Sequence, residues 1–83
     1  MEMRGPEIKA DQELDLRGVL CPYNYVKTKL RLEAMRLGQV LAVTIDEGEP
    51  ERNVPRSLLD EGQRVLLFER INGSVRLLIE KAA

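Results

Sequence analysis

The chain has no histidine, no tryptophan and a single cysteine among its 83 residues. One cysteine excludes an internal disulfide bond. Without histidine, a zinc, haem or iron–sulfur site has too few of its usual ligands, and catalysis by a histidine acid or base is excluded as well. We therefore expect no metal and no cofactor, and the cysteine is the first group to consider for reactivity.

Long apolar runs and an excess of positive charge are also missing. No stretch approaches the roughly 20 apolar residues of a membrane span, and the N-terminus lacks the apolar segment of a signal peptide. The net charge of −1 argues against nucleic acid as a direct partner, because phosphate binding needs a concentrated positive surface. A free thiol without a secretion signal fits a reducing compartment. We expect a cytoplasmic protein that binds neither membrane nor nucleic acid directly.

The length and composition indicate one small globular domain. Apolar residues make up 43% of the chain and charged residues 33%, a balance typical of soluble folded proteins rather than disordered ones. Residues 1–12 contain Gly5 and Pro6, mixed charge and little periodicity. We interpret them as a flexible N-terminal tail, and residues 13–83 as a single domain.

Six segments of that domain show the periodicity of strands or helices. The asparagine and glycine at 72–73 predict a tight hairpin, because both tolerate positive φ. Pro55 lies inside the second helical segment, so regular helix is expected to begin only around that residue. The expected elements, in chain order, are a strand at 13–17, a helix at 22–37, a strand at 39–46, a short helix within 47–61, and strands at 64–70 and 74–80.

The pattern within these elements predicts a two-layer α/β (α+β) sandwich. The first and last strands alternate apolar and polar residues, which suits a four-stranded mixed sheet with two helices on one face and solvent on the other. In the first helix, apolar residues three or four apart form one stripe, the side expected to face the sheet. This stripe consists of Tyr23, Val26, Leu30, Ala34 and Leu37.

Cys21 stands directly before Pro22, where the strand pattern has ended and the helical pattern begins. Proline is favoured at the first helical position, so Cys21 is expected at or next to the N-cap. Unpaired backbone N–H groups and the helix dipole favour a thiolate there, by about 0.3–1 kcal/mol. Because that is too little to ionise the thiol fully at pH 7, Arg17 is the expected additional cation.

Residues 14–22, LDLRGVLCP, resemble the Leu-Asp-x-x-Gly-x-x-Cys-Pro opening of the TusA/SirA-like sulfur carrier (sulfurtransferase) family, and the resemblance extends to about residue 81. It implies a β-α-β-α-β-β fold with strand order 1-2-4-3, the fourth strand antiparallel to the others. It also implies that Cys21 accepts sulfane sulfur as a persulfide, in a site shaped by Arg17, Gly18, Pro22 and Asn24.

The same resemblance implies protein partners rather than a bound cofactor. The donor would be a cysteine desulfurase or a rhodanese-like protein, and a downstream sulfur-acceptor protein would receive the sulfur. Destinations in the family include tRNA thiolation, cofactor synthesis and sulfur metabolism. The chain would then be a sulfurtransferase-type persulfide carrier rather than a self-contained enzyme.

One position departs from the family motif. The family has Cys-Pro-x-Pro, whereas Asn24 stands in place of the second proline, giving Cys-Pro-x-Asn. Unlike proline, asparagine has a backbone N–H, which adds a donor near the thiol. We hypothesise that Asn24 preserves the helix start while changing partner or substrate preference.

Two other interpretations of the lone cysteine stay open. Free cysteine is often buried and inert, so the fold could serve as a regulatory or protein-interaction module whose cysteine is never sulfurated. A redox sensor would form a sulfenic acid at Cys21, but the chain has no second cysteine to resolve it. For a carrier this absence is an advantage, because a neighbouring thiol would attack the persulfide and release sulfide.

Overall fold

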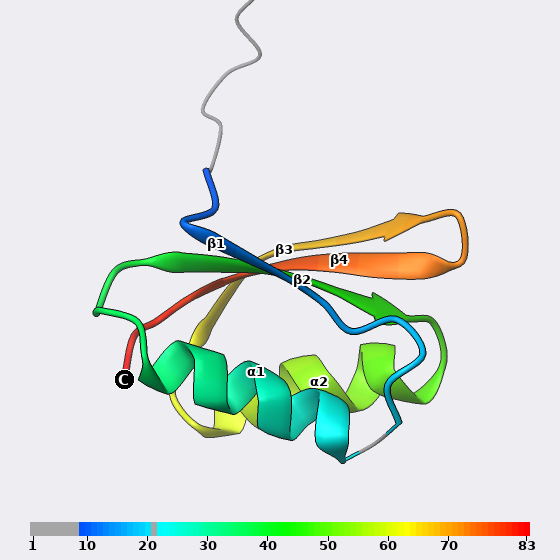
Figure 1. The fold of residues 1–83 in the computed structure, drawn as a ribbon, viewed down its shortest axis with the longest axis horizontal. Coiled ribbons are helices and arrows are strands. Elements are labelled where there is room, and N and C mark those ends of the chain that lie inside the picture. Colours follow the sequence, from blue (N-terminus) through cyan, green and yellow to red (C-terminus); the bar gives the residue numbers. More distant parts are fainter. Residues whose placement is uncertain (1–8, 21) are drawn as a thin grey trace, which may run out of the picture.

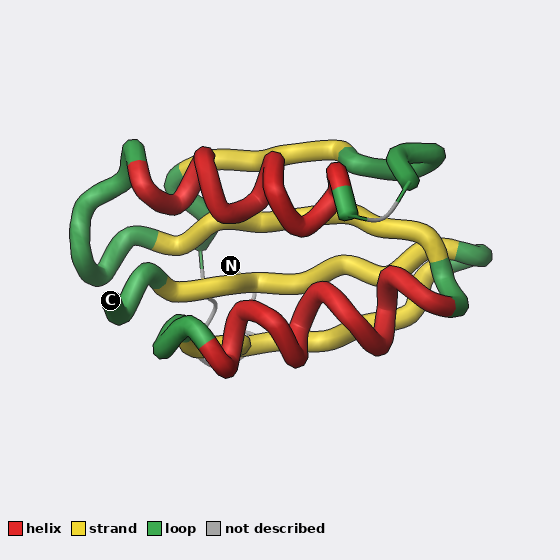
Figure 2. The backbone as a smooth tube through the Cα atoms, turned by 90° about the horizontal axis from the view of Figure 1, so that it is seen from below, coloured by secondary structure: helices red, strands yellow, loops and turns green. Residues whose placement is uncertain are grey.

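A computed structural model describes residues 9–20 and 22–83 of the chain. Two helices cover one face of a four-stranded sheet, and the other face is left open (Figures 1 and 2). The elements are β1 (Gln12–Asp15), α1 (Tyr23–Glu33), β2 (Val40–Asp46), α2 (Glu49–Asp60), β3 (Arg64–Ile71) and β4 (Ser74–Glu80). The predicted element order and two-layer architecture are therefore confirmed.

The strand order is β1-β2-β4-β3, as the family resemblance implied. β1 runs parallel to β2, and β4 is antiparallel to both β2 and β3. A parallel pair needs a crossover connection, and α1 is that crossover for β1 and β2. β3 and β4 are joined by the predicted hairpin, where Asn72 and Gly73 have φ of 46° and 84°.

The core lies between the sheet and the two helices. β2 and β4, the two central strands, supply most of it because their helix-facing residues have neighbours on every side. Leu32 of α1 and Leu58 of α2, each 1% exposed, close the core from the helical layer. The buried residues of the central strands on this face are Leu41, Val43, Ile45, Val75, Leu77 and Ile79.

The prediction for the buried face of α1 was wrong. Three of the apolar residues of the expected stripe, Tyr23, Leu30 and Leu37, are 64%, 59% and 69% exposed. The helix instead turns Asn24, Thr28 and Leu32 toward the sheet. Burial of Thr28 is tolerated because its hydroxyl donates a hydrogen bond to the backbone carbonyl oxygen of Asn24 at 2.9 Å. As a result, the apolar stripe of α1 faces solvent.

Both helices also differ from their predicted bounds. α1 ends at Glu33 instead of Leu37. The next two N–H groups bond to carbonyl oxygens three residues back, for example Met35 to Leu32 at 3.0 Å, so the helix tightens and stops. α2 is regular from Glu49 and includes Pro55, so the expectation of a start near Pro55 was wrong. Pro55 removes one N–H donor from this helix, but it does not end the helix, which continues to Asp60.

The contacts of the sheet begin before the predicted boundary at residue 13. The backbone N–H of Asp11 donates to the Val40 carbonyl oxygen at 2.7 Å, and the Val40 N–H donates to the Asp11 carboxylate at 2.8 Å. Ala10 packs against Val40 and Ala42 on the open face. Residues 1–8 of the expected tail lie outside the described residues. Neither helix of the described part is long and apolar enough to cross a membrane.

The orientation of α1 can be checked with two leucines on opposite sides of the helix. Leu32→Ala removes a side chain that is 1% exposed, so we expect it to lower the free energy of unfolding by about 2–4 kcal/mol. Leu30→Ala truncates a side chain that is 59% exposed and should change it by less than about 0.5 kcal/mol. Urea unfolding followed by circular dichroism measures both, and the reverse order would contradict this orientation.

Candidate functional site

Cys21 lies outside the described residues, so the site is defined here by the residues around it in the chain. Leu20 and Pro22, its two neighbours, are both exposed, Leu20 by 75%. They belong to the connection between β1 and the first turn of α1 (Figure 1). The motif residues therefore occupy the start of the crossover that leads from the edge strand back over the sheet.

The chain before Cys21 is anchored to the end of β2. The Leu16 N–H donates to the Thr44 carbonyl oxygen at 2.8 Å, and the Gly18 N–H donates to the Asp46 carboxylate at 2.7 Å. Gly18 has φ of 82°, a conformation that residues with a Cβ rarely adopt, although a Cβ there would meet no atom of the described residues within 4 Å. The backbone conformation, and not crowding, is therefore what favours glycine at this position.

Asp46 is a site residue that the sequence did not predict. It comes 28 residues after Gly18, and no local motif connects the two. The parallel register of β1 and β2 brings them together, since it pairs Asp15 with Thr44. In this part of the chain the acidic residues form no metal site: among the described residues no three histidine, cysteine, aspartate or glutamate side chains gather into one.

Arg17, predicted as a cation for the thiol, forms a two-point salt bridge with Asp15. Its Nε lies 2.9 Å from Oδ1 and its Nη2 lies 2.7 Å from Oδ2 of that carboxylate. The Arg17 side chain and its backbone N–H both donate to Asp15, which lowers the pKa of this carboxyl to about 2. The guanidinium therefore stabilises the end of β1, which is an edge strand of the sheet that the described residues form.

The helix start differs by one residue from the prediction. Pro22 is the N-cap of α1, with φ of −94° and ψ of 8°, and not its first helical residue. The Asn24 N–H, predicted as an additional donor near the thiol, donates to the Leu20 carbonyl oxygen at 3.2 Å. This bond links the residue before Cys21 to the first turn of α1. The N–H that proline would lack is therefore already used.

The Asn24 side chain is fully buried, at 0% exposure. Its Oδ1 accepts a hydrogen bond from the Tyr25 N–H at 2.6 Å, while its Nδ2 has no acceptor among the described residues. A buried donor without a partner costs about 1–3 kcal/mol. A residue with no exposed surface does not touch a partner protein directly. Any effect of Asn24 on partner preference must pass through the turn that it helps to form.

The predicted site residues thus separate into an exposed group and a buried one. Arg17, Gly18 and Pro22 are exposed around the connection between β1 and α1, whereas Asn24 lies beneath it. The described residues provide an anchored chain before Cys21, an exposed surface on both of its chain neighbours and a helix N-terminus. The N-cap residue of this helix makes no side-chain hydrogen bond, and the N–H groups of Asn24 and Tyr25 are already bonded. What this helix end offers an anion is therefore mainly the positive end of its dipole.

Comparison with known proteins identifies relatives along most of the chain. The family model described as Sulfurtransferase TusA matches residues 12–81. A candidate sulfur carrier protein of Archaeoglobus fulgidus is 45% identical over 65 residues, covering 78% of this chain and 74% of that protein. YedF, a candidate sulfur carrier protein of Escherichia coli strain K12, is 31% identical over 74 residues, covering 89% of this chain and 96% of YedF.

A solved structure shows the same fold. The crystal structure of a SirA-like protein from Desulfitobacterium hafniense superposes with a TM-score of 0.74 and covers 87% of this chain and 99% of that one. Its sequence identity is 22%, so the match concerns the arrangement of strands and helices alone.

The salt bridge between Arg17 and Asp15 can be tested by titration. We expect the Asp15 carboxyl to titrate near pH 2, so that the pair is intact above that pH and is lost as the pH falls through it. Arg17→Ala should move the midpoint up toward the ordinary aspartate value of 3.8. NMR of the Asp15 carboxyl carbon against pH measures both midpoints. Arg76→Ala, which removes a cation from Glu13 instead, is the control and should leave Asp15 unchanged.

Proposed function

Because this chain belongs to the TusA sulfurtransferase family, we propose that it is a sulfur carrier that holds a persulfide on Cys21 and relays the sulfur between two proteins. The observation that carries the proposal is the match of the family over residues 12–81, which includes the cysteine motif. The exposure of Leu20 and Pro22, on either side of Cys21, supports it further, because sulfur transfer requires access from another protein.

The transfer needs no cofactor. The Cys21 thiolate attacks the outer sulfur of a persulfide on the donor, a new S–S bond forms, and the donor cysteine leaves as a thiolate. In the second step a nucleophile of the acceptor attacks the outer sulfur on Cys21, which leaves as a thiolate in turn. The sulfane sulfur passes on without net oxidation or reduction of the carrier, and protons balance through solvent.

The residues around Cys21 support these steps in different ways. The bond from Gly18 to Asp46 anchors the chain before the thiol, and the bond from Asn24 to Leu20 ties the residue before Cys21 to α1. The dipole at the N-terminus of α1 would favour negative charge, on the thiolate that attacks and on the thiolate that leaves. With no second cysteine in the chain, the persulfide has no internal thiol to release its sulfur as sulfide.

The partners in this proposal are proteins. A cysteine desulfurase or a rhodanese-like protein would supply the sulfur, and a downstream acceptor protein would take it into tRNA thiolation, cofactor synthesis or sulfur metabolism. Cys21 alone would form covalent bonds, and Arg17, Gly18, Pro22 and Asn24 would shape the site.

Persulfide carriage predicts a specific gain of mass. Incubation with a cysteine desulfurase, pyridoxal phosphate and cysteine should add the mass of one sulfur atom to the intact protein, measured by mass spectrometry. The added sulfur should be lost on reduction with a thiol and should be absent from Cys21→Ser. A parallel reaction with a rhodanese and thiosulfate tests the second donor class. If neither donor adds sulfur, the carrier function is wrong and an interaction module with an unsulfurated cysteine takes its place.

The role proposed for Asn24 predicts a change in transfer rate. Asn24→Pro removes the N–H that bonds to the Leu20 carbonyl, so the turn around position 21 should change and protein-to-protein transfer should change several-fold. Loading from inorganic polysulfide, which needs no docking, should stay the same. Asn24→Ala, which keeps the N–H but loses the amide, is the matched control. Equal transfer rates for wild type and Asn24→Pro would exclude this role.

A further inference from the structure

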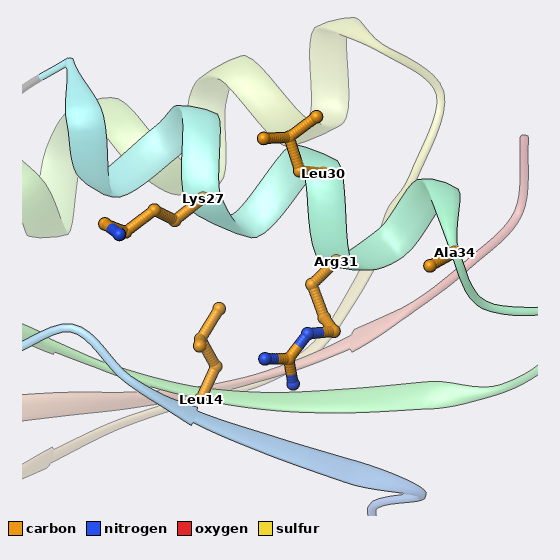
Figure 3. A pocket seen from close by; sticks show the side chains of 5 residues that line it. All are labelled: Leu14, Lys27, Leu30, Arg31 and Ala34. Atoms are coloured by element: carbon orange, nitrogen blue, oxygen red, sulfur yellow. The ribbon is translucent and has the colours of Figure 1, made fainter.

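A groove of about 310 Å³ lies between α1 and the edge strand β1. Leu14 points from β1 toward the helix, while Lys27 and Arg31 extend from α1 at the sides of the groove (Figure 3). Leu30 and Ala34 complete its lining. The groove therefore combines an apolar lining with two cations that lie one helical turn apart on one face.

The two cations of the groove are not neutralised within the described part of the chain. Lys27 and Arg31 take part in none of its salt bridges, and the hydrogen bond of Arg31 goes to the neutral amide oxygen of Gln12, at 3.2 Å. The cations that do pair with carboxylates are Arg17, Lys29, Arg64, Arg70 and Arg76. The groove thus lacks the carboxylates that balance charge elsewhere.

The groove continues into the exposed apolar surface of α1. Leu30 is 59% exposed, and Val26 and Tyr23, one and two turns nearer the helix start, are 41% and 64% exposed. Leu20, directly before Cys21 in the chain, is 75% exposed. Neighbouring large apolar side chains on a surface mark interaction sites, because leaving them in water is unfavourable. This apolar surface extends from the groove to the beginning of the helix.

We propose that the groove between α1 and β1 docks a segment of a partner protein that carries an apolar side chain among carboxylates. The apolar side chain would pack on Leu14, Leu30 and Ala34, and the carboxylates would pair with Lys27 and Arg31. Charge complementarity selects this occupant, because a basic or uncharged segment would leave both cations without partners. This proposal rests on the proposed function in one respect, which is that the protein that carries the segment also exchanges sulfur with Cys21.

The test is an NMR titration of the full, reduced chain, labelled with 15N, using the acetylated and amidated peptide Gly-Glu-Glu-Leu-Glu-Glu-Gly as the probe. We expect saturable shifts of the amide signals of the groove residues, with millimolar affinity. Lys27→Glu combined with Arg31→Glu should weaken binding about fivefold or more, since two charge pairs become repulsive. Leu30→Ser, a second variant that leaves the charges in place, should also weaken it.

Matched controls separate the groove from overall charge. Arg52→Glu combined with Arg56→Glu changes the net charge equally on exposed positions of α2, and it should bind as wild type does. Peptides with serine for leucine, or with glutamine for every glutamate, should bind more weakly. Saturable shifts confined to other surfaces, equal weakening by the α2 variant, or no saturable shift would overturn the proposal. So would binding to anionic lipid vesicles with no response to the peptide.

This titration does not depend on sulfur chemistry. A chain that binds the acidic peptide in the groove but gains no sulfur on Cys21 would retain the docking site and lose the proposed function. A chain that gains sulfur but does not bind the peptide would retain the proposed function and lose the docking site. The two failures are therefore distinguishable.

Discussion

The parallel pairing of β1 with β2 is the constraint on which the rest of the structure depends. Parallel neighbours cannot be joined by a tight turn, so the chain must leave the end of β1, cross the sheet and return to the start of β2. α1 is that crossover, and the cysteine motif occupies its beginning. The same register brings Asp46, at the end of β2, to the backbone of Gly18. The position of the site and its anchoring therefore follow from one strand pairing.

The side of α1 that faces the core determines which of its residues remain exposed. The helix packs through Thr28 and Leu32, and Tyr23, Val26 and Leu30 stay in contact with water. Burying them would add hydrophobic stabilisation, at roughly 25 cal/mol for each Å² removed from water. A small domain that forgoes this contribution keeps an apolar surface for other molecules. For a carrier, whose function consists of brief contacts with other proteins, such a surface is useful at the helix that follows Cys21, the proposed carrier residue.

The fold could be predicted because its signals are local. Alternation along residues 74–80, the hairpin signal at Asn72 and Gly73, and the apolar run in residues 40–45 each depend on neighbours in the chain, and each appears in the structure as predicted. The failures have a common origin as well. The spacing of apolar residues identified the apolar stripe of α1. It did not show which side of the helix packs against the sheet, and that side is the one with Asn24 and Thr28, both buried.

The sequence by itself determined the element order, the position of Cys21 before a helix-opening proline, and the family to which these belong, since all three are written in consecutive residues. Tertiary structure alone decided the contact of Gly18 with Asp46, the burial of Asn24 and the groove beside Leu14. These depend on distances between segments that are remote in the chain. Such distances are set by strand register and by the rotation of α1 about its axis, and neither is encoded in a short stretch of residues.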